Sequence, residues 1–228
     1  MTNLTPEMIE KAKAAKSAEE LLAASGLVQG GDLFGNDYDE AAQRALQKLP
    51  YLRSCKLESK LPNKVVFTVV SGDAVIYTEV AGEYYALSAA LRVLERSSEP
   101  TAFIASGLVY ASMPPMAVSL VGEHVKLSGG RDGSYITELL DALADSDLDG
   151  RVSRIFFEEK FDIVISVDAR FRVKLGGPED MTLKLHAAER VIEECGFALE
   201  EKGIIDVSDP QRPTSLKKND VDINSRRD

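Results

Sequence analysis

The chain has 228 residues, 44% of them hydrophobic, so it is long enough for one large or two small domains and too apolar for a disordered chain. It carries 27 Lys and Arg residues against 37 Asp and Glu residues, a net charge of -10. This acidic balance repels phosphate backbones and argues against nucleic acid as the main partner. No apolar run approaches the roughly 18 residues of a membrane helix, and residues 1–16 lack the apolar core of a signal peptide.

The first hundred residues predict two helices followed by strands. Pro6 at a first helical position and the helical spacing of apolar residues predict a helix over residues 1–24, and Pro50 ends a second helix over 39–48. The expected strands, which are rich in β-forming residues, cover 51–59, 64–70, 74–80 and 84–87. A polar break over 97–100 separates this half of the chain from the next.

The second half predicts an amphipathic helix, three strands, a long helix and two final strands. Residues 135–144 place their apolar side chains on one helical face, and Gly196 is a natural stop for a helix over 179–195. The expected strands cover residues 154–157, 163–167, 171–175, 203–207 and 214–218. A charged tail follows the last strand.

An acidic turn at residues 145–150 gives the sharpest local motif. Its sequence, DSDLDG, matches the DxDxDG opening of a calcium loop, in which carboxylates at positions one, three and five converge on a hard cation. Position twelve of that loop requires a bidentate Glu, and here it is Phe156. We therefore expect an acidic turn that leads into a strand, and no metal site.

The other candidates for chemistry are expected to be structural. His124 and His186 are the only histidines, and neither has the companion pattern of a metal site or a catalytic pair. Cys55 and Cys195 do not form a CxxC pair, so we expect two buried, reduced thiols. The glycine-rich stretch before Ser134 lacks the GK[ST] ending of a phosphate loop. The sequence thus predicts no catalytic residue and no cofactor.

Several short segments of the first half resemble a POTRA domain. They are SAEELLAASGL at 17–27, GGDLF at 30–34, LPYL at 49–52 and KLP at 60–62. Each has a physical purpose in that module: a capped helix, a turn before the second helix, a Pro that ends it, and a two-stranded ribbon.

Segments of the second half are similar to the β domain of the FtsQ/DivIB family of bacterial cell-division proteins. They are EYYAL at 83–87, RVLE at 92–95, SGL at 106–108, FRVKLG at 171–176, KL at 184–185 and GIIDVS at 203–208. Together with the POTRA-like segments, this ordered set covers roughly residues 17–218.

The resemblance implies an α+β fold, in which a POTRA-like α/β module precedes an antiparallel β domain with helices packed on one face. The expected parts are an N-terminal helical extension (1–16), a POTRA-like domain (17–98), an FtsQ/DivIB-type β domain (99–219) and a charged tail (220–228). The family's single membrane helix is not present in this sequence.

The resemblance also implies a binding protein without enzymatic activity on the extracytoplasmic face of the bacterial membrane. Its partners would be FtsB/DivIC-like and FtsL-like division proteins, and the family's partner site maps onto the last strand and the helix around residues 184–194. The partner-binding residues so implied are Thr214, Ser215, Leu216, Lys217 and Lys218. An exposed terminal strand suits such a role, because its unpaired backbone groups can accept a partner strand.

Two other classes of function stay open at this point. A POTRA-type protein transport or assembly module would be expected to have several tandem POTRA units or a barrel. A calcium-binding or hydrolytic domain would need calcium affinity or a convergent cluster of acid and base groups.

Overall fold

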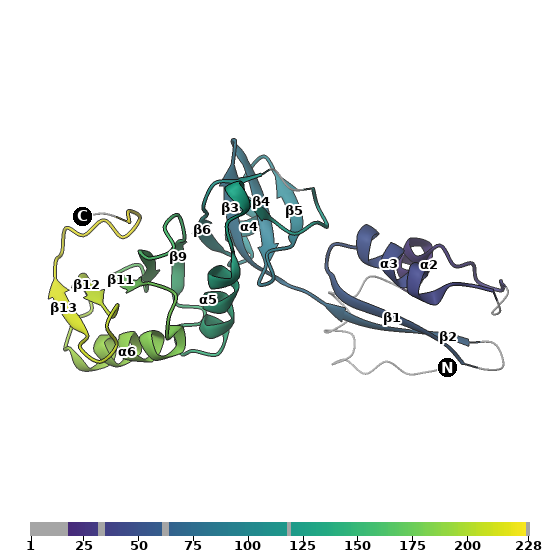
Figure 1. Cartoon of the computed structure of the whole chain (residues 1–228). Helices are drawn as coiled ribbons and strands as arrows, with labels where there is room; N and C mark the ends of the chain where they lie inside the picture. Colours follow the sequence, from purple (N-terminus) through teal and green to yellow (C-terminus); the bar gives the residue numbers. More distant parts are fainter. Residues whose placement is uncertain (1–17, 32–34, 61–63, 118–119, 227–228) are drawn as a thin grey trace.

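The computed structural model describes residues 18–226 except for 32–34, 61–63 and 118–119. In this part of the chain, a small unit of residues 18–71 is joined end to end with a larger unit that begins at residue 74 (Figure 1). The expected helical extension of residues 1–16 lies outside the described residues, and so do the last two residues of the tail.

The small unit consists of two helices packed on one face of a β-hairpin. Its elements are α2 (Ala18–Ser25), α3 (Tyr38–Lys48), β1 (Leu52–Lys60) and β2 (Lys64–Ser71). The carboxylate of Asp37 caps α3 by accepting the N–H of Glu40 at 2.9 Å, and Leu49 ends the helix directly before Pro50. The predicted second helix and both strands are confirmed to within one or two residues.

The larger unit is built on one sheet, to which nine strands of the described residues contribute. The strand order is β13-β12-β11-β10-β9-β6-β3-β4-β5. The strands are β3 (Ala74–Val80), β4 (Glu83–Ser88), β5 (Val93–Ser97), β6 (Val109–Ser112), β9 (Val152–Phe156), β10 (Ile163–Val167), β11 (Phe171–Gly176), β12 (Gly203–Asp206) and β13 (Thr214–Lys217). The helices are α4 (Thr101–Ala105), α5 (Ser134–Ala144) and α6 (Met181–Glu194). A short pair, β7 (Met116–Ala117) with β8 (Lys126–Leu127), and the 3-10 turn η1 (Ser128–Gly130) precede α5.

Most neighbouring strands in this sheet are antiparallel, and three pairs are parallel: β3 with β6, β6 with β9, and β11 with β12. Parallel neighbours need a crossover connection, which α5 supplies between β6 and β9 and α6 supplies between β11 and β12. Crossovers of the same hand place both helices on the same face of the sheet. The predicted α+β class is confirmed, and the parallel pairs make the sheet mixed.

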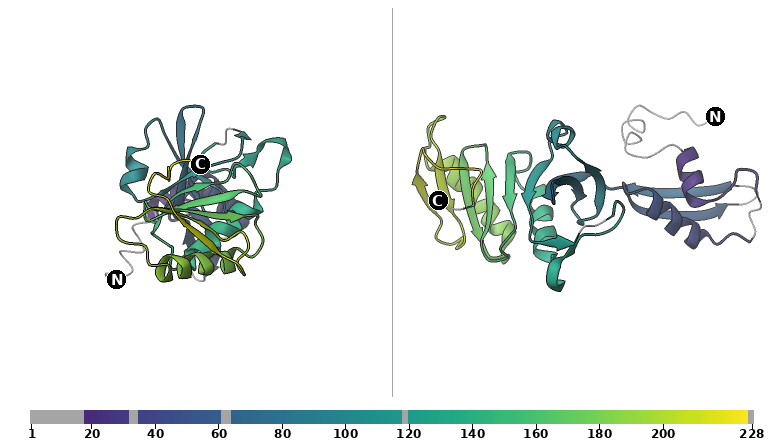
Figure 2. Two further views of the ribbon diagram at one scale, coloured as in Figure 1. Left: turned by 90° about the vertical axis from the view of Figure 1, so that its left-hand side faces the viewer. Right: turned by 90° about the horizontal axis from the view of Figure 1, so that it is seen from above.

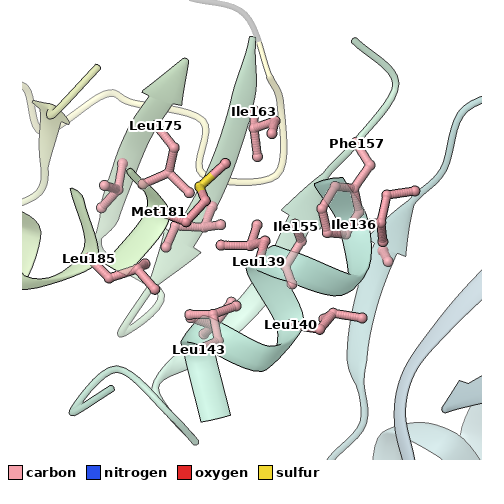
Figure 3. Close-up of a cluster of buried hydrophobic side chains, with 14 of the residues drawn as sticks. Ile136, Leu139, Leu140, Leu143, Ile155, Phe157, Ile163, Leu175, Met181 and Leu185 are labelled. Atoms are coloured by element: carbon pink, nitrogen blue, oxygen red, sulfur yellow. The ribbon is translucent and has the colours of Figure 1, made fainter. Parts of the chain in front are cut away.

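The main core lies between the sheet and the helices α5 and α6 (Figure 3). Along β10, Ile163, Ile165 and Val167 point into this core, while Val164 and Ser166 lie buried on the other face. Figure 3 shows the apolar face of α5 and the start of α6 converging on the strands. The labelled side chains are Ile136, Leu139, Leu140, Leu143, Ile155, Phe157, Ile163, Leu175, Met181 and Leu185. The short helix α4 covers part of the opposite face, where Phe103 packs on Tyr77 with ring centroids 6.0 Å apart.

The larger unit begins earlier in the chain than the expected boundary at residues 98–99. Strands β3, β4 and β5 lie in the same sheet as the C-terminal strands, and Ile76, Leu87 and Val93 belong to the same core as α5. The structural division therefore falls near Gly72, between β2 and β3. The polar break at 97–100 is only the turn that leads from β5 into α4.

The guanidinium of Arg92 holds the two units together. Its Nε donates to the carbonyl of Gly122 at 2.7 Å within the larger unit. Its Nη1 donates to the carbonyl of Leu52 in β1 at 2.5 Å, and its Nη2 donates to the carbonyl of Leu46 in the last turn of α3. Because the carbonyls of a last helical turn have no partner within the helix, a cation at this place also complements the helix dipole.

Gly122 allows this close approach. Its backbone has φ +95°, and a Cβ at this position would lie 3.3 Å from the carbonyl oxygen of Gln47 in α3. Both the conformation and the space therefore favour glycine. A second contact between the units joins Tyr51 Oη to Glu95 Oε2 at 3.0 Å, and burial together with this carboxylate raises the pKa of Tyr51 to about 12.

We predict that Arg92→Met loosens the joint between the units while both stay folded. A hydrogen bond from a charged donor contributes about 1.5–3 kcal/mol net, so the loss of two such bonds across the joint weakens it by a few kcal/mol, about 3 at the least. Small-angle X-ray scattering should show a broader distribution of dimensions, and limited proteolysis near Gly72 should be faster.

Arg96→Met is the matched control for this measurement. Arg96 lies in β5, four residues after Arg92, and pairs with Glu83 of β4 within the larger unit. Scattering profiles and cleavage rates that do not differ between the two variants would contradict the role assigned to Arg92.

Candidate partner-binding edge

Strand β13 forms one end of the large sheet and, among the described residues, has a neighbour on one side only. It pairs antiparallel with β12, with Ile204 opposite Leu216 and Ile205 opposite Ser215. All four of its residues are exposed. Figures 1 and 2 place β13 at the end of the molecule farthest from the small unit.

The register determines which backbone groups of β13 point outward. Lys218 donates its N–H to the carbonyl of Lys202 at 3.0 Å, so Lys218 and Lys202 form a hydrogen-bonded pair. Such pairs alternate along an antiparallel ladder, so Thr214 and Leu216 also direct their N–H and C=O groups toward β12. The N–H and C=O groups of Ser215 and Lys217 therefore point to the open side.

The opposite end of the sheet is less open. Residues 122–125 run beside the start of β5, where Val93 donates to the carbonyl of Glu123 at 2.8 Å and accepts from the N–H of Gly122 at 2.8 Å. Covering an edge in this way removes its capacity to pair with another chain. The joint to the small unit lies at the same end, through Arg92 and Glu95. Strand β13 is thus the more open edge of the two among the described residues.

Hydrogen bonds of the neighbouring loops position β13. The turn between β12 and β13 is held by the carboxylates of Asp206 and Asp209, which accept the N–H groups of Ser208 and Gln211 at 3.0 Å each. At the other end of the strand, Lys217 Nζ lies 2.7 Å from Glu201 Oε2. This hydrogen bond, together with one from the N–H of Ala198, lowers the pKa of Glu201 below its ordinary value.

The thiol of Cys195 lies directly beside the edge strand. Ser215 Oγ donates to Cys195 Sγ at 3.6 Å, from β13 to the C-terminal cap of α6. The prediction of two buried thiols is wrong for Cys195, which is exposed, because it follows the last turn of α6 where the helix leaves the sheet. Cys55 lies half-buried between β1 and the helices of the small unit, and burial raises the pKa of its thiol.

The structure brings only the end of the helix named in the sequence analysis close to this edge. Lys184, in the first turn of α6, is 3% exposed and donates its Nζ to the carbonyl of Gly177 at 2.8 Å. Burial lowers the pKa of this amine. The stem of Lys184 therefore serves packing, while Cys195, the residue directly after this segment, borders β13.

The acidic turn at residues 145–150 is fastened to α6 and to the core. Leu148 is completely buried, which explains an apolar residue between exposed carboxylates. The buried carboxylate of Glu189 accepts the N–H of Asp147 at 2.9 Å and lies 2.9 Å from His186 Nδ1. His186 thus helps to hold the carboxylate of Glu189 that links α6 to the acidic turn. Phe156, at position twelve of the calcium pattern, is buried in β9.

In residues 18–226 without the three gaps, no cluster of three or more His, Cys, Asp and Glu residues has an arrangement that could hold a metal ion. Over the same ranges, no helix combines the length and the apolarity that crossing a bilayer requires.

Comparisons with known proteins agree on one family. The model of the FtsQ-type POTRA domain matches residues 9–70. The cell division protein DivIB of Clostridium botulinum strain Hall is 23% identical over 190 residues, which are 83% of this chain and 72% of that protein. DivIB of the strain Loch Maree is 22% identical over 203 residues, 89% of this chain and 77% of the relative.

Among solved structures, the major extracytoplasmic domain of DivIB from Geobacillus stearothermophilus is similar in part. It is 16% identical, with a TM-score of 0.34, and the match covers 57% of this chain and 99% of that domain.

We predict that the acidic turn does not bind calcium tightly. Its closing ligand is replaced by the buried Phe156, and Leu148 fixes the turn to the core, so the carboxylates cannot complete a coordination sphere of six to eight oxygens. Calorimetric titration with calcium should show no micromolar binding. Binding at micromolar concentration that Asp147→Ala abolishes would refute this expectation.

Proposed function

Because this chain belongs to the FtsQ/DivIB family of bacterial cell-division proteins, we propose that it is a non-enzymatic scaffold that binds FtsB/DivIC-like and FtsL-like partners. We place the contact at the open edge of β13, at residues Thr214, Ser215, Leu216, Lys217 and Lys218. By the same relationship, we place the described units on the extracytoplasmic face of the membrane.

The observation that carries this proposal is the outward direction of the backbone groups of Ser215 and Lys217. A partner strand that pairs with them would extend the sheet beyond β13, and the main-chain hydrogen bonds would set its register. Thr214 and Leu216 lie on the face of the sheet that carries Ile204, and Leu216 is 59% exposed. An apolar side chain of the partner can pack on Leu216 from that face.

The position of the edge suits a scaffold. The small unit is joined to the β5 end of the sheet, and β13 lies at the opposite end (Figure 2). A partner on β13 would therefore leave the small unit accessible to another protein. One chain could then hold two division proteins at a fixed separation.

We predict that Ser215→Pro reduces partner affinity by roughly tenfold or more, since proline removes an outward N–H and places its ring where the partner strand would pair. Ser215→Ala is the matched control, because it removes the hydroxyl and keeps the N–H. Its affinity should stay close to that of the unchanged protein. Leu216→Glu should weaken binding as well, through the exposed apolar contact.

The measurement is a calorimetric titration with the FtsB/DivIC–FtsL ectodomain pair from the same organism, with circular dichroism and thermal melting as folding controls. If a folded Ser215→Pro protein binds at full strength, the partner site lies elsewhere, and the POTRA-like unit becomes the leading candidate.

The two native thiols give a second measurement on the unchanged protein. A partner strand on β13 should slow the alkylation of Cys195, which is exposed beside Ser215. Cys55 lies in the small unit and should react at the same rate with and without the partner. Equal rates at Cys195 in both states would argue against contact at this edge.

A further inference from the structure

Strand β13 is held by one ladder and by side-chain contacts of Ser215 and Lys217 at the surface of the sheet. It has four residues, all exposed, and its ladder hydrogen bonds run to β12 alone. A short edge strand near the end of a chain opens easily, because few buried groups resist its separation from the sheet. A preformed docking edge therefore needs an additional anchor.

The chain after β13 turns back at once and crosses the sheet. Val221 donates its N–H to the carbonyl of Lys218 at 3.3 Å, and Asn219 Oδ1 accepts the N–H of Lys202 at 3.2 Å. The segment then continues over the face opposite to α5 and α6, and Figure 1 shows it in yellow beyond β13. Residues 219–226 are called the C-terminal strap below.

A row of three side chains holds the strap by its backbone. Arg172 of β11, Ser166 of β10 and Arg154 of β9 are direct cross-strand neighbours, since Ser166 is opposite both arginines in the two ladders. Their side chains donate to three consecutive carbonyls of the strap. The pairs are Arg172 Nη2 with Asp222, Ser166 Oγ with Ile223, and Arg154 Nη1 with Asn224 at 3.4 Å.

Burial strengthens this attachment. Arg172 and Ser166 are completely buried, and Val221 of the strap is 5% exposed. A buried guanidinium must keep its hydrogen-bond acceptors, because losing them leaves a desolvated charge. Arg226 adds an ion pair with Asp162, its Nε lying 3.7 Å from the carboxylate. Displacing the strap would therefore cost apolar burial and charge-assisted hydrogen bonds together.

We propose that the C-terminal strap positions β13: its attachment to the row Arg154–Ser166–Arg172 keeps the edge strand in register and ready to receive a partner. Because the strap continues directly from Lys218, its attachment fixes the C-terminal end of β13, while the turn at Asp209 fixes the other end. The readiness for a partner rests on the proposed function, whereas the ordering of β13 does not.

Two shortened proteins test this inference. One ends at Lys218 and lacks the strap. The other ends at Asn224 and keeps the three carbonyls that the row binds, while losing the charges of Arg226 and the residues after it. Hydrogen exchange at the N–H groups of Leu216 and Lys218, which point to β12, reports on the pairing of β13.

In the protein that ends at Lys218, exchange at these two N–H groups should become about tenfold faster, since the strap hydrogen bonds no longer hold the strand. The protein that ends at Asn224 should exchange nearly as slowly as the full chain. Ser166→Ala in the full chain removes one carbonyl donor and should give an intermediate rate. This variant keeps the test decisive if the shorter truncation does not fold.

Partner affinity separates the two proposals. Faster exchange with a matching loss of affinity supports both. Faster exchange with unchanged affinity supports the strap and moves the partner site away from β13, so only the proposed function fails. Unchanged exchange in both the protein that ends at Lys218 and the Ser166→Ala variant overturns the strap. An affinity that rises on truncation also overturns it, because the segment would then block the edge.

Discussion

The guanidinium of Arg92 joins segments that no regular secondary structure connects. One side chain bonds to carbonyls in the last turn of α3, at the start of β1 and in the loop beside β5. Burial lowers the pKa of this group, as expected where a cation has been withdrawn from water. The connection between β2 and β3 is only two residues long, and one of them is Gly72, whose backbone can rotate easily. The contacts of Arg92 therefore set the relative orientation of the two units.

This joint gives the large sheet two different ends. At the β5 end, residues 122–125 and the small unit cover the strand. At the β13 end, the backbone groups of two residues stay directed to the outside. Edges that are left open expose a protein to unwanted pairing, and natural sheets limit this risk with short edge strands and lysines. Strand β13 has both features, with four residues and Lys217 in its sequence, which suits selective rather than indiscriminate pairing.

Elements with strong local patterns could be predicted closely from the sequence. The sequence predicts both ends of β10 (163–167) correctly, because four of its five residues are Ile or Val, which favour strands. Strand β5 and helix α4 were missed, since VLERS and TAFIA are short and lack a clear period. The assignment of 74–97 to the first unit followed chain order, whereas sheet membership is decided by distant pairings such as that of β3 with β6.

The position of the candidate site could be predicted, but the contacts that support it could not. A turn with two prolines followed by the extended residues 214–218 indicates a last strand, and the register then shows that the backbone N–H and C=O of Ser215 point outward. The segment after Lys218 is polar, which in sequence is typical of a solvated tail. Its attachment uses backbone carbonyls, which every residue carries, so no pattern of side chains in the strap announces it. The informative signal lies instead in Ser166 and Arg172, buried polar residues whose sequence neighbours are buried as well, so that they require hydrogen-bond partners from elsewhere in the chain.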